Sequence, residues 1–152
     1  MDHVVCLDAD SKEIENLISG NKSMIIRGAD SIKPPYGIVN EGDILYFIDD
    51  KRGGGVRARG VVSLVLNSDQ LSVEESYETV IMYQEKLQLP DQQFDRWAGK
   101  KYLVLIGLAD IEEVEPFQIN ESNFSKTDDW LTVGNIEKVI LNQSLGRLAD
   151  FQ

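Results

Sequence analysis

The chain contains little cysteine, histidine or proline: its 152 residues include one cysteine, one histidine and four prolines. A single cysteine, Cys6, excludes an internal disulfide and fits a reducing compartment, so we expect a cytoplasmic protein. One histidine, His3, offers neither the ligand set of a zinc site nor a basis for a histidine-containing catalytic triad. We therefore expect no metal site and no cofactor.

Long apolar runs are also missing. No run approaches the length of about 20 residues that a membrane-spanning helix requires. The first ten residues, MDHVVCLDAD, lack the basic region followed by an apolar stretch that marks a secretion signal. We expect no contact with a membrane.

Positive charge is scarce as well. The sequence has 15 lysines and arginines against 26 aspartates and glutamates, which gives a net charge of −11. General binding to duplex DNA needs a broad basic surface, so we do not expect it here. A compact basic pocket remains compatible with this charge, because electrostatic interactions in physiological salt are screened over about 8 Å.

What the sequence does contain is a regular series of short apolar segments. Its length predicts one domain, residues 1–152. Hydrophobic periodicity predicts helices at 10–19, 72–89 and 91–98, and strands at 22–27, 44–48, 56–66 and 101–108. It also predicts strand structure at 111–119, which either continues the strand at 101–108 or pairs with it. A last short helix is predicted within 130–141. About five strands are too few for a sandwich, so we expect an α+β domain, a small mixed or antiparallel β pseudo-barrel with flanking helices.

Local signals support several of these boundaries. Gly20 is typical of a helix C-terminus, and Ser72 followed by Glu75 forms a capping box at a helix start. Gly60 is typical of a bulge or bend inside a strand. The segment Asp49–Gly55 is typical of a hairpin connection.

Four segments in order resemble one known family. The first is SGNKSMIIR, in which a helix end, Ser19-Gly20, precedes Lys22, Ser23 and Arg27. The others are Gly-Asp entering the strand LYF, the strand ARGVVSLVL, and KKYLVLIGLADIEEVEPFQI. Together they resemble the ASCH domain of the PUA-like superfamily over about residues 10–120, with 121–152 as a C-terminal extension. The resemblance implies a PUA-like pseudo-barrel with a cleft between the first helix and the barrel.

The resemblance also implies two kinds of activity. Relatives in the superfamily bind RNA or modified nucleotides at such clefts, so these are the expected partners. Some small ASCH proteins are amidohydrolases that act on acylated cytidine nucleosides, with a lysine matching Lys22, a threonine where this chain has Ile25, and a glutamate farther along. Glu74, Glu75 and Glu78 are candidates for that glutamate. If the chain is an enzyme, Lys22 and Glu74 are its expected catalytic residues.

Six residues are candidates for ligand binding: Lys22, Ser23, Arg27, Tyr36, Arg57 and Arg59. Lys22 is either a pocket cation or an exposed lysine at a strand edge. Arg27 either clamps a phosphate or carboxylate, or forms a structural salt bridge with Asp30 or Asp43.

The remaining candidates have similar alternatives. Alternation places Arg57 and Arg59 on one face of a strand, where they line a ligand groove or join a solvated charge network. Tyr36 either stacks on a base or covers the end of the barrel. The leading interpretation is a binding domain for RNA or a modified nucleotide. The alternatives are the amidohydrolase and a protein-interaction domain using helix 72–89, which an exposed apolar stripe on that helix would favour.

Overall fold

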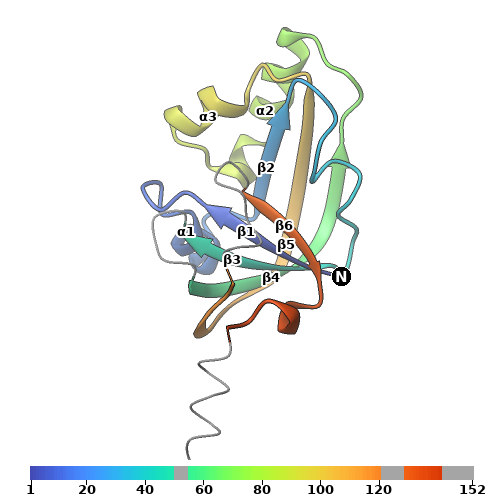
Figure 1. The fold of residues 1–152 in the computed structure, drawn as a ribbon. Helices are drawn as coiled ribbons and strands as arrows, with labels where there is room; N and C mark the ends of the chain where they lie inside the picture. Colours follow the sequence, from blue (N-terminus) through green and yellow to red (C-terminus); the bar gives the residue numbers. More distant parts are fainter. Residues whose placement is uncertain (50–54, 121–128, 142–152) are drawn as a thin grey trace, which may run out of the picture.

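The computed structural model describes residues 1–49, 55–120 and 129–141 (Figure 1). These described residues form, in chain order, β1 (Asp2–Leu7), α1 (Glu13–Ser19), β2 (Met24–Ala29), β3 (Ile44–Asp49), β4 (Gly55–Asn67), α2 (Val73–Leu87), α3 (Asp91–Trp97), β5 (Tyr102–Gln118), β6 (Trp130–Gly134) and the short 3₁₀ helix η2 (Ile136–Lys138). No helix in this described part of the chain has the length and apolar character needed to cross a bilayer.

The six described strands form one mixed sheet in the order β2-β5-β4-β3-β1-β6. Strands β1 and β3 are parallel, and the other neighbours are antiparallel. The pairing of β4 with the long strand β5 shifts register at three points, which lets the sheet curl into a half-barrel. Gly60 lies at one of these shifts, and a β-carbon there would come within 2.5 Å of the Ile111 side chain. The predicted bulge is confirmed.

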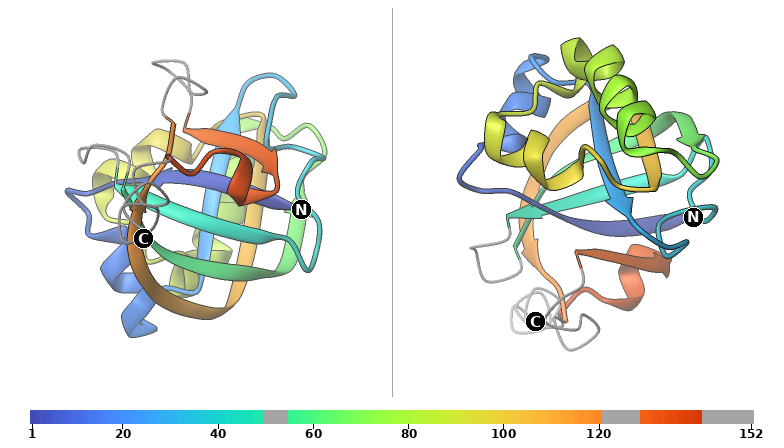
Figure 2. Two further views of the ribbon diagram at one scale, coloured as in Figure 1. Left: turned by 60° about the horizontal axis from the view of Figure 1, so that its bottom comes forward. Right: turned by 90° about the horizontal axis from the view of Figure 1, so that it is seen from above.

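The helices α1, α2 and α3 lie on one side of the molecule, and β6 and η2 lie on the other (Figure 2). The side chains of strand β2 alternate between the two faces of the sheet. Met24 and Ile26 pack toward α2 and α3 in one apolar cluster, whereas Ile25 belongs to the cluster inside the barrel. Since side chains two residues apart share a face of a strand, Arg27 lies on the same side as Ile25.

Several predicted boundaries agree with the structure. Gly20 ends α1 with a positive φ of 85°, and Ser72 and Glu75 form the reciprocal capping box of α2. The strand structure predicted at 101–108 and 111–119 is one continuous strand, β5. Of the predicted hairpin connection Asp49–Gly55, residues 50–54 lie outside the described residues.

The structure adds a strand near each end of the described chain. Within residues 130–141, where a last short helix was predicted, the structure has strand β6 followed by the short 3₁₀ helix η2, so the prediction holds only for Ile136–Lys138. Strand β1, which the sequence reading did not identify, pairs with β6 on one side and with β3 on the other. The sheet therefore has six strands in its described part, one more than expected, and residues beyond 121 contribute one of its edges.

Candidate functional site

Arg27 lies at the open seam of the half-barrel, between the two edges of the sheet. It is carried by the edge strand β2, and its Nη2 donates a hydrogen bond to the carbonyl of Cys6 on β1 at 2.8 Å. Its Nη1 donates to the carbonyl of Ile26 at 2.8 Å. Its Nε lies 3.0 Å from Oδ2 of Asp129, the residue directly before the other edge strand, β6. Arg27 therefore connects the two edges of the sheet through its guanidinium group.

Two indole rings hold the same guanidinium group. The Arg27 Cζ is 5.5 Å from the ring centroid of Trp97 on α3 and 5.8 Å from that of Trp130 on β6. Arg96 packs on Trp97 as well, with its Cζ at 4.5 Å. Only 9% of the Arg27 side chain is exposed. Since two carbonyls and two aromatic rings fix its orientation, Arg27 is a preorganised cation.

A pocket of about 130 Å³ opens beside Arg27. We call it the seam pocket, and its lining is Arg27, Gly28, Ala29, Ser31, Lys33, Pro34, Pro35, Tyr36, Arg96, Trp97, Tyr102, Val104 and Asp129. Tyr36 and Tyr102 pack edge to face at 5.8 Å between ring centroids. The Tyr36 hydroxyl donates to the carbonyl of Ser68 at 2.5 Å, which fixes the ring in this lining. The pocket thus combines aromatic walls with three cations and one carboxylate.

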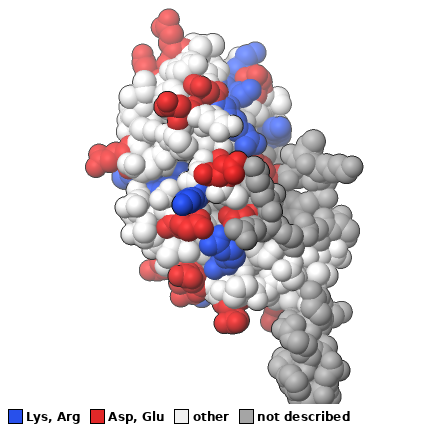
Figure 3. Space-filling view, turned by 90° about the vertical axis from the view of Figure 1, so that its left-hand side faces the viewer, with Lys and Arg blue, Asp and Glu red and all other residues white. Residues whose placement is uncertain are grey.

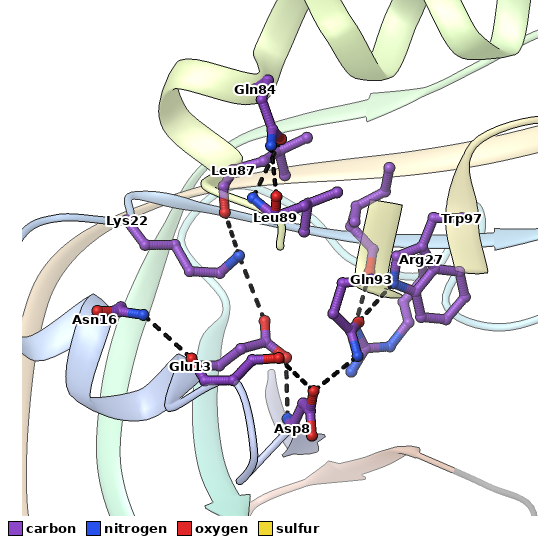
Figure 4. Close-up of polar contacts among 12 residues, drawn as sticks. Asp8, Glu13, Asn16, Lys22, Arg27, Gln84, Leu87, Leu89, Gln93 and Trp97 are labelled. Carbon is purple, nitrogen blue, oxygen red and sulfur yellow. Dashed lines mark hydrogen bonds and ion pairs between the residues drawn. The ribbon is translucent and has the colours of Figure 1, made fainter. Parts of the chain in front are cut away.

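Lys22 is buried between α1 and the end of α2, as Figure 4 shows. Its amine donates to the carbonyl of Leu87, the last residue of α2, and lies 3.4 Å from Oε2 of Glu13 at the start of α1. Burial lowers the pKa of Lys22, and the Glu13 carboxylate opposes this shift. Lys22 is therefore a buried, paired cation and not an exposed lysine at a strand edge.

A chain of hydrogen bonds connects the Lys22 pair to the wall of the seam pocket (Figure 4). The Glu13 carboxylate accepts the backbone N–H of Asp8 at 2.9 Å. The Asp8 carboxylate accepts from the Gln93 amide at 2.9 Å, and the Gln93 oxygen accepts from the Trp97 indole at 3.2 Å. Helix α3 is thereby tied to α1, and the Trp97 ring is fixed beside Arg27.

Sequence reasoning did not identify the polar partners Asp8, Glu13, Gln93 and Asp129. One signal was present for Glu13, because it lies four residues before Leu17 and so shares the buried face of α1. A carboxylate on such a face requires a cation or hydrogen-bond donors. The partner of Arg27 needs a correction: its carboxylate is Asp129, and neither predicted partner, Asp30 or Asp43, occupies that place.

Three other binding candidates lie away from the seam pocket. Ser23 is exposed and lies directly before β2. Arg57 contacts the carboxylates of Asp49 and Glu15. Arg59 contacts Oε1 of Glu112 at 2.6 Å. None of these three candidates is among the described residues that line the pocket, and the two arginines correspond to the charge-network alternative.

The residues named for amide hydrolysis are not brought together. Glu74 is exposed in the first turn of α2, whereas Lys22 contacts Leu87 at the last. Thirteen residues of helix separate these positions by about 20 Å. Ile25, at the place of the family's threonine, is buried inside the barrel. The carboxylate beside Lys22 is Glu13, not Glu74.

Helix α2 leaves part of its apolar surface exposed. Val73 and Ile81 are each 62% exposed and Tyr77 is 39% exposed, while Val80 and Leu87 are buried. Spacing of four residues places the three exposed side chains along one stripe. This stripe is the observation that favours the protein-interaction alternative. The seam pocket, by contrast, has charged side chains that can select a ligand.

The surface charges are mixed. Figure 3 shows lysine and arginine side chains interspersed with acidic ones, without a continuous basic surface over the described residues of that face. Among residues 1–49, 55–120 and 129–141, no group of three or more histidine, cysteine, aspartate or glutamate side chains is placed to hold a metal ion.

Comparison with known proteins identifies the fold. No family model matches the chain, and no curated protein matches it. The chain is similar to the crystal structure of ASCH from Zymomonas mobilis, with a TM-score of 0.66 and 15% identity over 97% of this chain and 94% of that one. A Ser-to-Ala mutant of that protein gives a TM-score of 0.67 at 15% identity, covering 97% and 95% of the two chains. The chain therefore has the fold of this ASCH protein, and the predicted α+β pseudo-barrel with flanking helices is confirmed.

Proposed function

We propose that this ASCH-fold chain is a binding module for a nucleotide or a short single-stranded RNA, and that the seam pocket is its binding site. The observation that carries the proposal is Arg27, a buried cation fixed in orientation at the wall of a pocket with aromatic sides. Proteins that bind unpaired nucleotides combine aromatic or guanidinium planes, on which bases stack, with cations that contact phosphates.

The size of the pocket limits the ligand. At about 130 Å³ it is smaller than the 300–1,000 Å³ of sites that enclose a drug-sized molecule. A single base or phosphate group is therefore the part of the ligand that enters. Arg96 is 55% exposed and also lines the pocket, so it lies where the rest of a nucleotide would leave it.

Binding is a better account of this geometry than amide hydrolysis. The amine of Lys22 is occupied by the Leu87 carbonyl and by Glu13, and Lys22 is not among the described residues that line the pocket. Its hydrogen-bonded connection through Gln93 to Trp97 supports the pocket wall instead. Lys22 then acts as a positioning residue for the site.

The test is a titration with adenosine 5′-monophosphate and with a short single-stranded RNA at low salt, followed by tryptophan fluorescence. Trp97 lines the pocket and reports its occupation. We expect saturable binding that Arg96→Ala weakens about fivefold to tenfold, because a phosphate contact is lost. Arg59→Ala is the matched control, since it removes an exposed arginine paired with Glu112 away from the pocket.

Two outcomes contradict the proposal. One is the absence of saturable binding by the folded wild-type protein. The other is equal affinity of the Arg96→Ala and Arg59→Ala proteins, which would place the ligand elsewhere on the surface.

A further inference from the structure

Asp129 is the only carboxylate among the described residues that line the seam pocket. Its Oδ2 lies 3.0 Å from Nε of Arg27 and 3.8 Å from Nη2 of Arg96, so one oxygen faces both arginines. The arrangement matters because these arginines are the pocket's best phosphate-binding groups. The Asp129 carboxylate is therefore an internal anion that already contacts both arginines.

The contact between Asp129 and Arg27 is an ion pair without a well-directed hydrogen bond. The Arg27 Nε is buried, and its N–H is not aligned with any acceptor that the structure describes, although the Asp129 oxygen is near. Hydrogen bonds weaken steeply when they are misaligned, so this pair lacks the strength of a directed, charge-assisted contact. Arg27 thus keeps a buried donor available for a better-placed acceptor.

The two partners differ in how freely they can move. Arg27 is fixed by the carbonyls of Cys6 and Ile26 and by two indole rings. Among the described residues, the backbone of Asp129 is held by its carbonyl, which accepts the Cys6 N–H at 2.9 Å, and its side chain contacts Arg27 and Arg96. Its side chain is 33% exposed and can change rotamer toward solvent. Arg27 would then remain as a buried cation without a counter-ion, which is costly unless another anion replaces the carboxylate.

We propose that Asp129 determines which ligands the seam pocket accepts, because its carboxylate holds the place of a phosphate on Arg27 and Arg96 and a phosphate-bearing ligand enters by displacing it. This inference rests on the proposed function and specifies its ligand class. A ligand with a terminal or bridging phosphate gains both arginines when Asp129 turns away. A neutral nucleoside has no group that replaces the carboxylate, so the ion pair persists and the pocket discriminates against it.

The experiment compares adenosine 5′-monophosphate with adenosine, which differ only in the phosphate, on the wild-type and Asp129→Asn proteins. Asparagine has nearly the same shape but no charge. We expect Asp129→Asn to bind the monophosphate about fivefold to tenfold more tightly, with adenosine changed less than about twofold. Inorganic phosphate should compete with the monophosphate in the variant. Glu112→Gln is the matched control, because it removes one negative charge paired with Arg59.

Each outcome decides the inference. If Asp129→Asn binds the monophosphate no more tightly than Glu112→Gln does, the inference is overturned. The proposed function still stands in that case, provided that the wild-type protein binds the monophosphate. Equal gains for adenosine and its monophosphate, or no competition by inorganic phosphate, also overturn the inference. If neither the wild-type protein nor Asp129→Asn binds the monophosphate, both the inference and the proposed function are rejected. A second variant, Asp129→Ser, should also bind the monophosphate more tightly than the wild-type protein. Circular dichroism of all variants checks that they are folded.

Discussion

At the scale of single residues, Lys22 and Glu13 illustrate how a buried ion pair supports a site without entering it. Their side chains are 2% and 9% exposed, and the pair joins the start of α1 to the end of α2. Taking two charges out of water is costly, and the pair repays this cost only while both partners are present. The stability of the contact between α1 and α2 therefore depends on Lys22 and Glu13 being present together.

Lys22→Met should destabilise the fold by about 3–5 kcal/mol, because it leaves the Glu13 carboxylate buried without its cation. The double variant Lys22→Met with Glu13→Gln should lie within about 1 kcal/mol of wild type, since neither charge remains. Glutamine keeps an oxygen that can accept the Asp8 N–H, so that hydrogen bond is preserved. Urea unfolding of the three proteins measures the difference. A Lys22→Met protein as stable as wild type would contradict the buried pair.

Residues of the site differ in how well the sequence identified them. Lys22 and Arg27 were recognised because they lie within one continuous motif, SGNKSMIIR. Their counter-ions, Glu13 and Asp129, lie 9 and 102 positions away, and no local pattern connects them to the cations. Which of 26 acidic residues meets a given arginine is decided by the curvature of the sheet, which the sequence pattern does not specify.

At the scale of elements, the edge strand β6 is the clearest limit of prediction. The strand has only five residues in the structure, WLTVG, and its hydrogen-bonding partner β1 lies near the other end of the chain. Helices such as α2 carry their own start and stop signals, so they are predictable locally. A short strand whose stability comes from a distant partner gives no comparable signal.

A polar cluster joins β6 to β1 and β3. His3 on β1 is fully buried, with Nε2 at 2.8 Å from Asp43 Oδ2 and Nδ1 at 3.2 Å from the Trp130 indole nitrogen. An indole N–H can only donate, so Nδ1 accepts and Nε2 carries the hydrogen that Asp43 accepts. Asp43 also accepts the Asn40 backbone N–H at 2.9 Å. One carboxylate thus organises the start of β3 and the histidine beneath β6.

Replacing Asp43 should change how stability depends on pH. Burial opposes ionisation of Asp43, but hydrogen bonds from His3 and Asn40 outweigh it and lower its pKa. The ionised side chain therefore stabilises the fold above its ordinary pKa, and this contribution is lost as the pH falls through the lower pKa of the folded state. Asp43→Asn should lower the melting temperature at neutral pH and flatten its decline in acid. Thermal unfolding across that range measures this, with the exposed Asp69→Asn as control. Parallel curves for wild type and Asp43→Asn would contradict the role of Asp43.

At the scale of the whole molecule, local and overall charge have opposite signs. The net charge is −11, while the seam pocket carries three cations against one carboxylate. Long-range fields repel a polyanion such as RNA, and contacts within the pocket attract the small part of it that enters. The composition alone argues against an extended basic surface, but it does not locate the pocket, whose described lining comes from four separated parts of the chain.

Salt dependence follows from this separation of charges. Each phosphate that the protein neutralises on single-stranded nucleic acid contributes about −0.7 to the slope of log affinity against log salt concentration. One phosphate held by Arg27 and Arg96 together gives about −0.7, and a second phosphate at Lys33 brings the slope to about −1.4. Screening of the overall negative charge favours binding as salt rises, which makes the slope shallower still. We therefore expect a slope no steeper than about −1.5 for a short single-stranded RNA. Fluorescence titrations over a series of salt concentrations measure it, with Arg59→Ala as a variant whose slope should match wild type. A slope of about −4 or steeper would require phosphate contacts far outside the seam pocket and would contradict a site confined to Arg27, Arg96 and Lys33.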